Sequence, residues 1–386
     1  MRPITRAEVT STLAEMIAIP SVNPDLVPGA EGERALAEWI AARLRRTPGI
    51  GVELQDAGGG RPNVIATVGS GPGRTLMLNG HIDVVGVAGM PDPWSGRVEG
   101  NRQYGRGAAD MKGAMAVALL LLEHIAAAGD FPGRLVVTFV VDEEYASIGT
   151  AAVCREIERW KPDAALVLEG TGLDVCIAHK GFAWATVTTH GFAAHGSAFE
   201  VGIDAIGHMG RVIVALEEYA RELLTRTPHP LVGPPSVHSS LVRGGQELSS
   251  YPETCTLELE RRTIPGETEA QVQAELQGIL DRLAAADPAF NATLEMGLFR
   301  EPFGIEPDAE IVQMVRDTAQ QVLGREVTHV GAAGWMDSAF LATAGVPTAI
   351  FGPDGEGAHG LEEWVDLDTL DAFAAVLTRV AYEYCR

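Results

Sequence analysis

Short apolar runs alternate with helix-like segments through most of the chain, and this alternation limits the fold more than any other feature of the sequence. The runs are "VELQDA", "NVIATVG", "TLMLNG", "RLVVTFVV", "AALVLE" and, much later, "PTAIFG", with amphipathic or apolar helical segments at about 31–46, 110–128 and 146–159. Strands that alternate with helices predict an α/β layer built on a largely parallel sheet.

The pattern changes over residues 182–298. Strand-like runs ("AWATVTTHG", "SVHSSLVRGG", "TCTLELERRTI" and "ATLEMGLF") and two helical segments follow one another there in the order β-α-β-β-α-β. This order predicts one antiparallel sheet with two helices, a ferredoxin-like α+β unit. Because 386 residues also favour two domains, we expect a discontinuous α/β domain, residues 1–181 and 299–386, interrupted by an inserted domain, residues 182–298.

Charge and composition exclude several classes of partner. The chain has 29 Lys and Arg against 52 Asp and Glu, a net charge of −23, which argues against binding to nucleic acid or to anionic membranes. No apolar run reaches the roughly 18 residues that cross a bilayer, and the first residues lack the apolar core of a signal peptide. The four cysteines are scattered and form no CxxC pair. We therefore expect a cytoplasmic protein with reduced, structural thiols.

Acidic and histidine side chains stand where several of the apolar runs end. Since ligands bind at the carboxyl ends of strands in open α/β sheets, these residues are expected to meet in one cleft. One further residue of the set opens a helix in "GRGAADMKG", and another follows a Gly-rich loop. The set is His81, Asp83, Asp110, Glu143, Glu144, Glu169 and His359.

So many carboxylates in one cleft would raise one another's pKa values, and a bound cation removes that conflict. Histidine and carboxylate ligands without a thiolate suit zinc, with manganese or cobalt as substitutes. Each residue alone also has an ordinary structural interpretation. Asp110 could be a helix N-cap, Glu143 and Glu144 an acidic first turn, and the others turn or loop residues. Their joint occurrence at strand and helix ends favours a metal centre.

The motifs "GHIDVV", "GRGAADMKG", "DEE", "LEG", "AAHGS", "ERRTIPGE" and "GAHGLEEWV" extend over nearly the whole chain. Because these motifs occur in this order, the chain resembles the acetylornithine deacetylase and succinyl-diaminopimelate desuccinylase family of co-catalytic zinc amidohydrolases and metallopeptidases. The resemblance implies a zinc-peptidase-like three-layer catalytic domain, with the inserted domain as a lid and dimerisation domain.

The resemblance also implies roles for the residues at the strand ends. Two zinc ions per chain would be held with a shared aspartate, and a water activated by both would attack the substrate with Glu143 as general base. Asp83 would orient a histidine ligand, and the peptide bond after the shared aspartate would be cis. The implied ligands are His81, Asp110 and Glu169 for one ion, and Asp110, Glu144 and His359 for the other.

In the inserted domain, the resemblance implies that His195 stabilises the oxyanion, in cis or from a partner subunit, and that Arg262 binds a substrate carboxylate. Lys180 and Arg243 are candidates to line the cleft. Ser249 stands where relatives usually have Asn, which leaves the substrate preference open. Arg261 should point to the other face of its strand and be structural.

The expected activity is hydrolysis of the amide bond of an N-acyl amino acid, with acetylornithine-type deacylation as the nearest match. A carboxypeptidase or dipeptidase, or a succinyl-diaminopimelate desuccinylase-like activity, would use the same metal site. A catalytically silent metal-binding protein is a further alternative, and a dinuclear phosphoesterase is disfavoured because no phosphate-binding Gly loop is present. The expected partners are a small N-acyl amino acid or short peptide and a second copy of the chain.

Overall fold

The chain divides into two units in the computed structural model, which describes residues 2–386. The first unit contains the residues up to Ile177 together with Ile305–Val330 and Met336–Arg386. The second unit contains Ala178–Gly304 and the short segment Gly331–Trp335. The sequence pattern places the insertion at 182–298 and does not assign Gly331–Trp335 to it.

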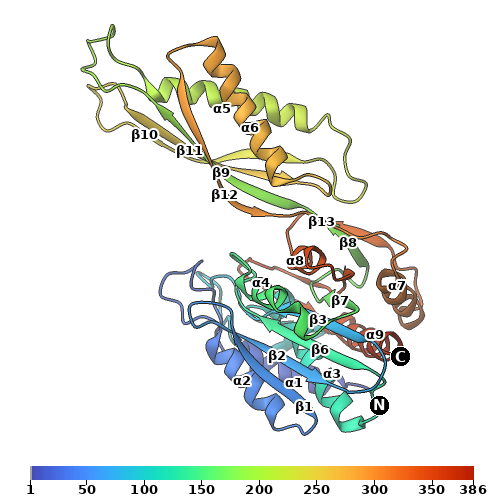
Figure 1. The fold of residues 1–386 in the computed structure, drawn as a ribbon. Helices are drawn as coiled ribbons and strands as arrows, with labels where there is room; N and C mark the ends of the chain where they lie inside the picture. Colours follow the sequence, from blue (N-terminus) through green and yellow to red (C-terminus); the bar gives the residue numbers. More distant parts are fainter. Residues whose placement is uncertain (1) are drawn as a thin grey trace. The chain divides into compact units, whose positions relative to one another are not determined.

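The largest sheet is mixed, with nine strands in the order β1-β2-β6-β3-β7-β15-β8-β13 and β14 paired to β8, among the residues that the structure describes (Figure 1). The pairs within β6-β3-β7-β15 are parallel, whereas β1-β2, β2-β6, β15-β8 and β8-β13 are antiparallel. The expectation of a largely parallel sheet therefore holds for its centre and not for these outer pairs. The link from β1 to β2 is a short turn, which can only join antiparallel strands. The strands are β1 (Ile50–Asp56), β2 (Pro62–Val68), β3 (Thr75–His81), β6 (Arg134–Val140), β7 (Ala164–Val167), β8 (Val175–His179), β13 (Phe303–Gly304), β14 (His329–Ala332) and β15 (Thr348–Ile350).

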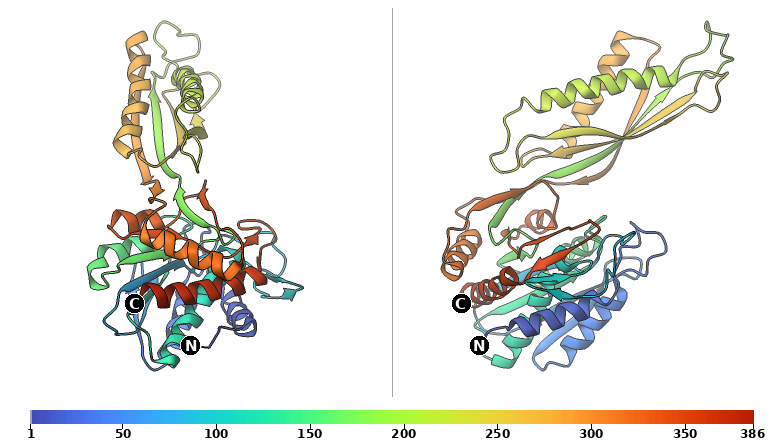
Figure 2. Two further views of the ribbon diagram at one scale, coloured as in Figure 1. Left: turned by 90° about the vertical axis from the view of Figure 1, so that its right-hand side faces the viewer. Right: turned by 180° about the vertical axis from the view of Figure 1, so that it is seen from behind.

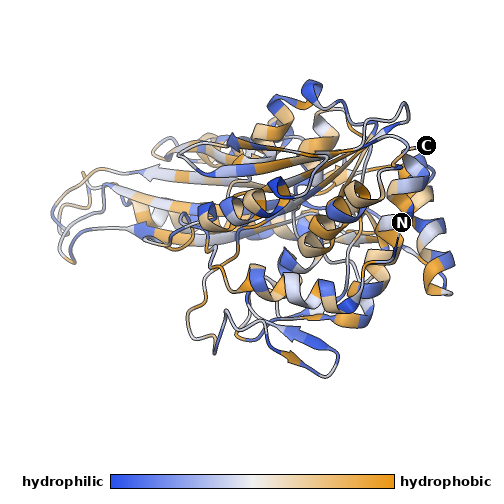
Figure 3. Cartoon of the chain, turned by 90° about the horizontal axis from the view of Figure 1, so that it is seen from below, coloured by the Kyte–Doolittle hydropathy of each residue, from blue (hydrophilic) through white to orange (hydrophobic). Residues whose placement is uncertain are grey.

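Helices cover this sheet, so the central strand β3 is buried along almost its whole length. Helices α1, α3 and α9 pack on one another, and α4 packs on α8. Figure 3 shows helices that carry both hydrophobic and hydrophilic residues, as expected for elements with one buried face. The helices are α1 (Arg6–Ile17), α2 (Arg34–Arg45), α3 (Gly113–Ala128), α4 (Ile148–Arg155), η2 (Ile157–Arg159), α7 (Glu310–Leu323), α8 (Ser338–Thr343) and α9 (Leu367–Tyr384).

Helix α3 is apolar on nearly every side. Together with the irregular turn η1 (Ala108–Lys112), it forms one segment, Ala108–Ala128, that is long and apolar enough to cross a membrane by length and composition. However, 78% of that window is buried inside the structure. An apolar helix with this burial is the core helix of the first unit, and it is weak evidence for a membrane span.

A small second sheet in the first unit brings distant parts of the chain together. Its order is β16-β17-β5-β4, and β17 pairs with β5 through Trp364 and Tyr104. The segment that leads to Asp110 leaves β5, and the loop that carries His359 connects β16 to β17. The strands are β4 (Val98–Glu99), β5 (Arg102–Tyr104), β16 (Gly355–Glu356) and β17 (Trp364–Asp366).

The second unit is an antiparallel sheet with two helices, in the expected β-α-β-β-α-β order. The strand order is β10-β11-β9-β12, and Figures 1 and 2 show α5 and α6 lying against this sheet. Alternate residues of β9 and β11 are buried, as required of a sheet with one covered face. The fold class expected from the sequence is confirmed. The elements are β9 (Gly181–His190), α5 (Ala205–Leu223), β10 (Ser236–Gly244), β11 (Thr254–Thr263), α6 (Glu269–Ala286) and β12 (Asn291–Arg300).

Candidate metal centre

Three neighbouring parallel strands end at the same edge of the large sheet. His81 is the last residue of β3, Glu143 and Glu144 follow β6, and Glu169 follows β7. A Cβ at Gly80, the residue before His81, would lie 2.3 Å from Met115 Sδ and 2.6 Å from Met111 Cε, so these two methionine side chains would have to move. The parallel order of the strands thus assembles residues that are far apart in the sequence.

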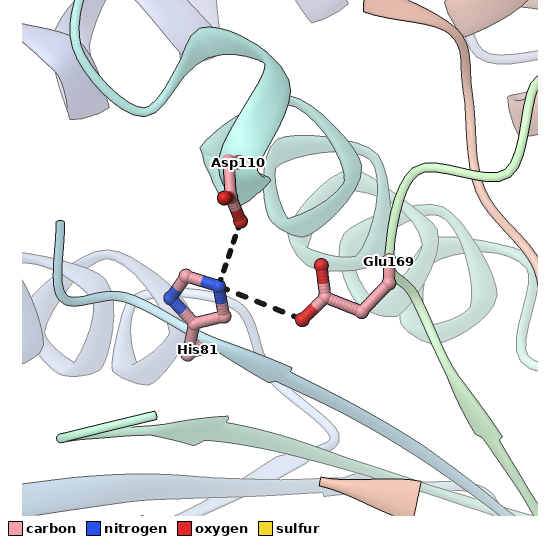
Figure 4. A group of neighbouring side chains, drawn as sticks. All are labelled: His81, Asp110 and Glu169. Carbon is pink, nitrogen blue, oxygen red and sulfur yellow. Dashed lines mark hydrogen bonds and ion pairs between the residues drawn. The ribbon is translucent and has the colours of Figure 1, made fainter. Parts of the chain in front are cut away.

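The first group of candidate ligands is His81, Asp110 and Glu169, whose ligand atoms lie within 4.8 Å of one another. Figure 4 shows the two carboxylates directed at the same ring nitrogen of His81. Nε2 of His81 lies 3.1 Å from Asp110 Oδ1 and 3.6 Å from Glu169 Oε1. The imidazole is fully buried, so its position is determined by the protein.

The second group is Asp110, Glu144 and His359, again within 4.8 Å. Nε2 of His359 lies 2.9 Å from Glu144 Oε2 and 3.5 Å from the second oxygen of Asp110. Asp110 therefore directs one carboxylate oxygen to each group, which is the arrangement of a bridging ligand. The peptide bond from Asp110 to Met111 is cis, as the resemblance implies.

The electrostatics of the two groups favour a bound cation. Burial raises the pKa of Glu169 to about 8, and it also raises the pKa of Glu144. Hydrogen bonds with Asp110 and Glu144 raise the pKa of His359 to about 10. Oε1 of Glu144 is buried without a hydrogen-bond partner among residues 2–386. An oxygen in that state suits a metal ligand, and histidine and carboxylate donors without a thiolate fit hard or borderline divalent ions.

Glu143 lies beside the two groups and belongs to neither of them. Its Oε2 is 4.0 Å from His81 Nε2, and its side chain is 11% exposed. Burial raises the pKa of Glu143 well above the usual range, and the nearby carboxylates of Glu169 and Asp337 act in the same direction. A buried carboxyl group with a raised pKa next to candidate ligands has the properties of a proton-transfer group.

Asp83 contacts the ring nitrogen of His81 that faces away from the other candidate ligands. Nδ1 of His81 lies 3.0 Å from the main-chain oxygen of Asp83 and 3.5 Å from its carboxylate. The carboxylate accepts hydrogen bonds from the main-chain N–H groups of Glu143 (3.1 Å) and Glu144 (3.2 Å). Asp83 thus contacts the imidazole through both its main-chain oxygen and its carboxylate, and the carboxylate also holds the turn after β6.

Sequence reasoning missed two buried polar residues near this centre. Nδ2 of Asn23 donates to Asp83 at 2.8 Å, and Asp337 accepts a hydrogen bond from Thr150 at 2.6 Å. Both are buried, and burial raises the pKa of Asp337 to about 6. Asn23 stands in an ordinary "NPD" turn, and Asp337 is the N-cap of a short helix, so neither carries a signal that sequence alone could separate from a structural role.

Other candidate residues lie in the second unit or at its start. A short bridge between His195 and Ser250 brings the His195 loop beside Ser249, whose main-chain oxygen accepts from Gly196 at 2.7 Å. His195 is exposed, and its Nδ1 lies 2.8 Å from Ser197 Oγ.

The basic candidates of this unit already have partners within it. Arg262 donates from Nε to Glu260 at 2.7 Å, and Arg243 pairs with Glu258 on the surface. Lys180 donates to the main-chain oxygen of Pro234 at 2.7 Å. The other arginine of the pair, Arg261, is fully buried and bonded to Glu267, so the prediction that it is structural is confirmed.

Comparisons with known proteins identify the family to which the chain belongs. The model of peptidase family M20/M25/M40 matches residues 77–383. Acetylornithine deacetylase of Myxococcus xanthus is 29% identical, over 99% of this chain and 98% of that protein. N-formyl-4-amino-5-aminomethyl-2-methylpyrimidine deformylase of Halalkalibacterium halodurans is 26% identical, over 98% of this chain and 95% of the relative.

Solved structures agree on the fold. An M20 family metallo-carboxypeptidase of Sulfolobus solfataricus superimposes with a TM-score of 0.79 at 18% identity, covering 97% of this chain and 98% of that one. A dinuclear metal-binding M20 peptidase of Bacillus subtilis gives a TM-score of 0.73 at 17% identity, covering 98% of both chains. The protein is therefore a metallo-hydrolase, and the chain belongs to peptidase family M20/M25/M40.

Proposed function

We propose that the protein hydrolyses the amide bond of an N-acyl amino acid, releasing a carboxylate and a free amine, with acetylornithine-type substrates as the first to test. One observation carries the proposal: Asp110 directs one carboxylate oxygen to each of the two ligand groups, and the carboxyl group of Glu143 lies beside these groups. The acetylornithine deacetylase similarity supports the choice of substrate class.

His81, Asp110 and Glu169 would hold one zinc ion, and Asp110, Glu144 and His359 the other, with cobalt or manganese as substitutes. Such ions make water more acidic and polarise a carbonyl group. Glu143 would take a proton from the attacking water as the new C–O bond forms, and would then deliver it to the nitrogen of the leaving amine as the C–N bond breaks.

The residues of the second unit are proposed from the family resemblance. His195 would donate a hydrogen bond to the oxyanion, and Arg262 would bind the substrate carboxylate as a bidentate guanidinium. Lys180, Arg243 and Ser249 are proposed to contact the rest of the substrate. We also propose a cytoplasmic homodimer formed through this unit. The four free cysteines support a reducing compartment.

A peptidase activity on dipeptides or on C-terminal residues would use the same centre, as would deformylation or desuccinylation. The experiment is hydrolysis of a panel of N-acetyl, N-formyl and N-succinyl amino acids and dipeptides by zinc- or cobalt-loaded protein, with a chelator-treated control. Metal-dependent release of amine from the acyl amino acids supports the proposal. Cleavage of dipeptides alone would replace it with a peptidase, and no turnover of any substrate would contradict it.

A further inference from the structure

The carboxylate of Glu363 lies next to the segment that carries Asp110 but belongs to neither group of candidate ligands. Glu363 is fully buried and directly precedes β17. Since Trp364 of β17 pairs with Tyr104 of β5, the register places Glu363 opposite the segment that runs from Gly105 to Asp110. The main-chain oxygen of Glu363 accepts the N–H of Gly105 at 3.0 Å, which anchors this register.

The Glu363 carboxylate uses its whole acceptor capacity on that segment. Oε1 accepts the main-chain N–H groups of Ala109 (2.9 Å) and Asp110 (3.1 Å). Oε2 accepts the N–H of Gly107 (3.0 Å) and Nη1 of Arg106 (2.7 Å). An ionised carboxylate offers about four lone-pair positions, and four donors are present. The backbone of Asp110 is therefore held by one side chain from the other end of the sequence.

The same buried pair also reaches the loop of the other ligand. Nη2 of Arg106 donates to the main-chain oxygen of Gly360 at 2.7 Å, next to His359. Gly355 allows β16 to lie close to the Asp110 segment, because a Cβ at position 355 would be only 2.7 Å from the Cβ of Ala109. The Asp110 segment and the His359 loop are thus joined to each other through Arg106 and Glu363.

We propose that Glu363 is a positioning residue for the metal centre, which fixes the shared ligand Asp110 and couples it to the loop of His359. The proposal rests on the metal centre of the proposed function. A glutamine cannot replace Glu363, because its NH₂ group would face N–H donors of the Asp110 segment or of Arg106. Removing partners behind metal ligands typically weakens binding by about 10- to 100-fold.

The test is titration of metal-free protein with Co²⁺, followed by calorimetry and by the visible absorption of the bound ion. We expect two Co²⁺ per wild-type chain, and in Glu363→Gln about 10- to 100-fold weaker binding with an altered spectrum, because the geometry at Asp110 changes. If this variant does not fold, Glu363→Asp carries the test. It keeps the charge but is one methylene shorter, so it should bind Co²⁺ more weakly than the wild type and with an altered spectrum.

Two controls separate positioning from general loss of stability. Glu267→Gln breaks a comparable buried ion pair with Arg261 in the other unit, where Glu267 also accepts the Ile264 N–H at 2.9 Å. Glu362→Gln changes the exposed neighbour. Both should bind Co²⁺ as the wild type does. Unchanged affinity and spectrum in the folded Glu363 variants, or an equal loss in Glu267→Gln, would overturn the proposal. Failure of the wild type to bind Co²⁺ would instead reject the metal centre itself.

Discussion

At the scale of single residues, the proposed general base Glu143 stands apart from the candidate metal ligands. It lies 4.0 Å from His81 Nε2 but contributes no atom to either ligand group. A substitution there should therefore affect proton transfer while leaving the ligands in place.

We expect Glu143→Ala to lower kcat by about 10²- to 10⁴-fold, the usual contribution of a general acid–base group. Metal content, measured by elemental analysis, should remain that of the wild type. Glu362→Gln, an exposed acid close to His359 in sequence, is the matched control and should keep full activity. An active Glu143→Ala enzyme would remove this residue from the mechanism.

The metal-free protein should lose stability as the pH rises. The pKa of Glu169 is raised from 4.5 to about 8 by burial, and that of His359 from 6.5 to about 10 by its hydrogen bonds. The native state therefore keeps protons that the unfolded chain has lost. Its free energy of unfolding falls with pH between each pair of values, because the stabilisation from a raised native pKa is complete below the unfolded pKa and is lost as the pH rises to the native pKa.

Zinc binding requires a neutral His359 and ionised carboxylates, so the metal should oppose this loss. We expect the Tm of the chelated protein to fall from about pH 6 to about pH 9, while the gain in Tm on adding zinc grows. Calorimetric scans with and without zinc measure both. A Tm of the metal-free protein that rises over this range would show that the buried acids are not protonated there.

The sequence predicts a site residue where an acidic or histidine side chain occupies an unusual position for its type. Acids and histidines after apolar strands indicate a site, and the structure brings His81, Asp110, Glu144, Glu169 and His359 together. Asn23 acts through a hydrogen bond to the carboxylate of Asp83, and Glu363 through hydrogen bonds to the backbone. Such bonds depend on which groups come near, and that proximity arises only when the chain is folded.

At the scale of elements, the end of β15 supports Glu169. The main chain at Gly352 passes so close to that of Glu169 that a Cβ would lie 2.1 Å from the Glu169 oxygen. Backbone contacts this close cannot relax through side-chain rotation.

We therefore expect Gly352→Ala to destabilise the protein by about 1–3 kcal/mol, as overpacking usually does, and to weaken Co²⁺ binding by displacing Glu169. Gly210→Ala in α5 is the opposite case, since nothing lies within 4 Å of the added Cβ. It should gain about 0.5–1 kcal/mol from helix propensity. Urea unfolding measures both. Equal stability of the two variants would contradict the close approach at Gly352.

Long apolar strands and periodic helices were predictable as elements, and the order of the second unit followed from its alternating strands. The antiparallel pairs at the two sides of the large sheet were not predictable, because the direction of a strand depends on how it is connected to its neighbours. The small sheet was missed for another reason. Its strands have two or three residues, and a run of that length has no measurable periodicity.

At the scale of the whole molecule, β10 is the strand most open to a second chain. It lies at the edge of its sheet, and Leu241 and Val242 are 48% and 58% exposed. An unpaired, partly apolar edge strand favours pairing with another chain. This feature and the family resemblance both point to a homodimer.

Sedimentation should give a mass twice that of the 40.9 kDa chain. A lysine on the edge, Val242→Lys, should shift the protein toward monomer, because charged edges resist pairing. Mixing Glu143→Ala and His195→Ala chains should restore part of the activity if His195 acts in trans. A wild type that sediments as a monomer at all concentrations would contradict the dimer.

The small sheet has a consequence for synthesis on the ribosome. The candidate ligands His81, Glu144 and Glu169 stand at or just after the ends of β3, β6 and β7, whereas the loop with His359 lies beside β17, which pairs with β5. During translation the group of candidate ligands is therefore completed only after β17 has been synthesised and has paired with β5. A chain that ends after the last strand of the large sheet has the candidate carboxylate ligands. It lacks His359 and also Glu363, which joins the Asp110 segment to the His359 loop. Truncated products should thus be metal-poor rather than partly active.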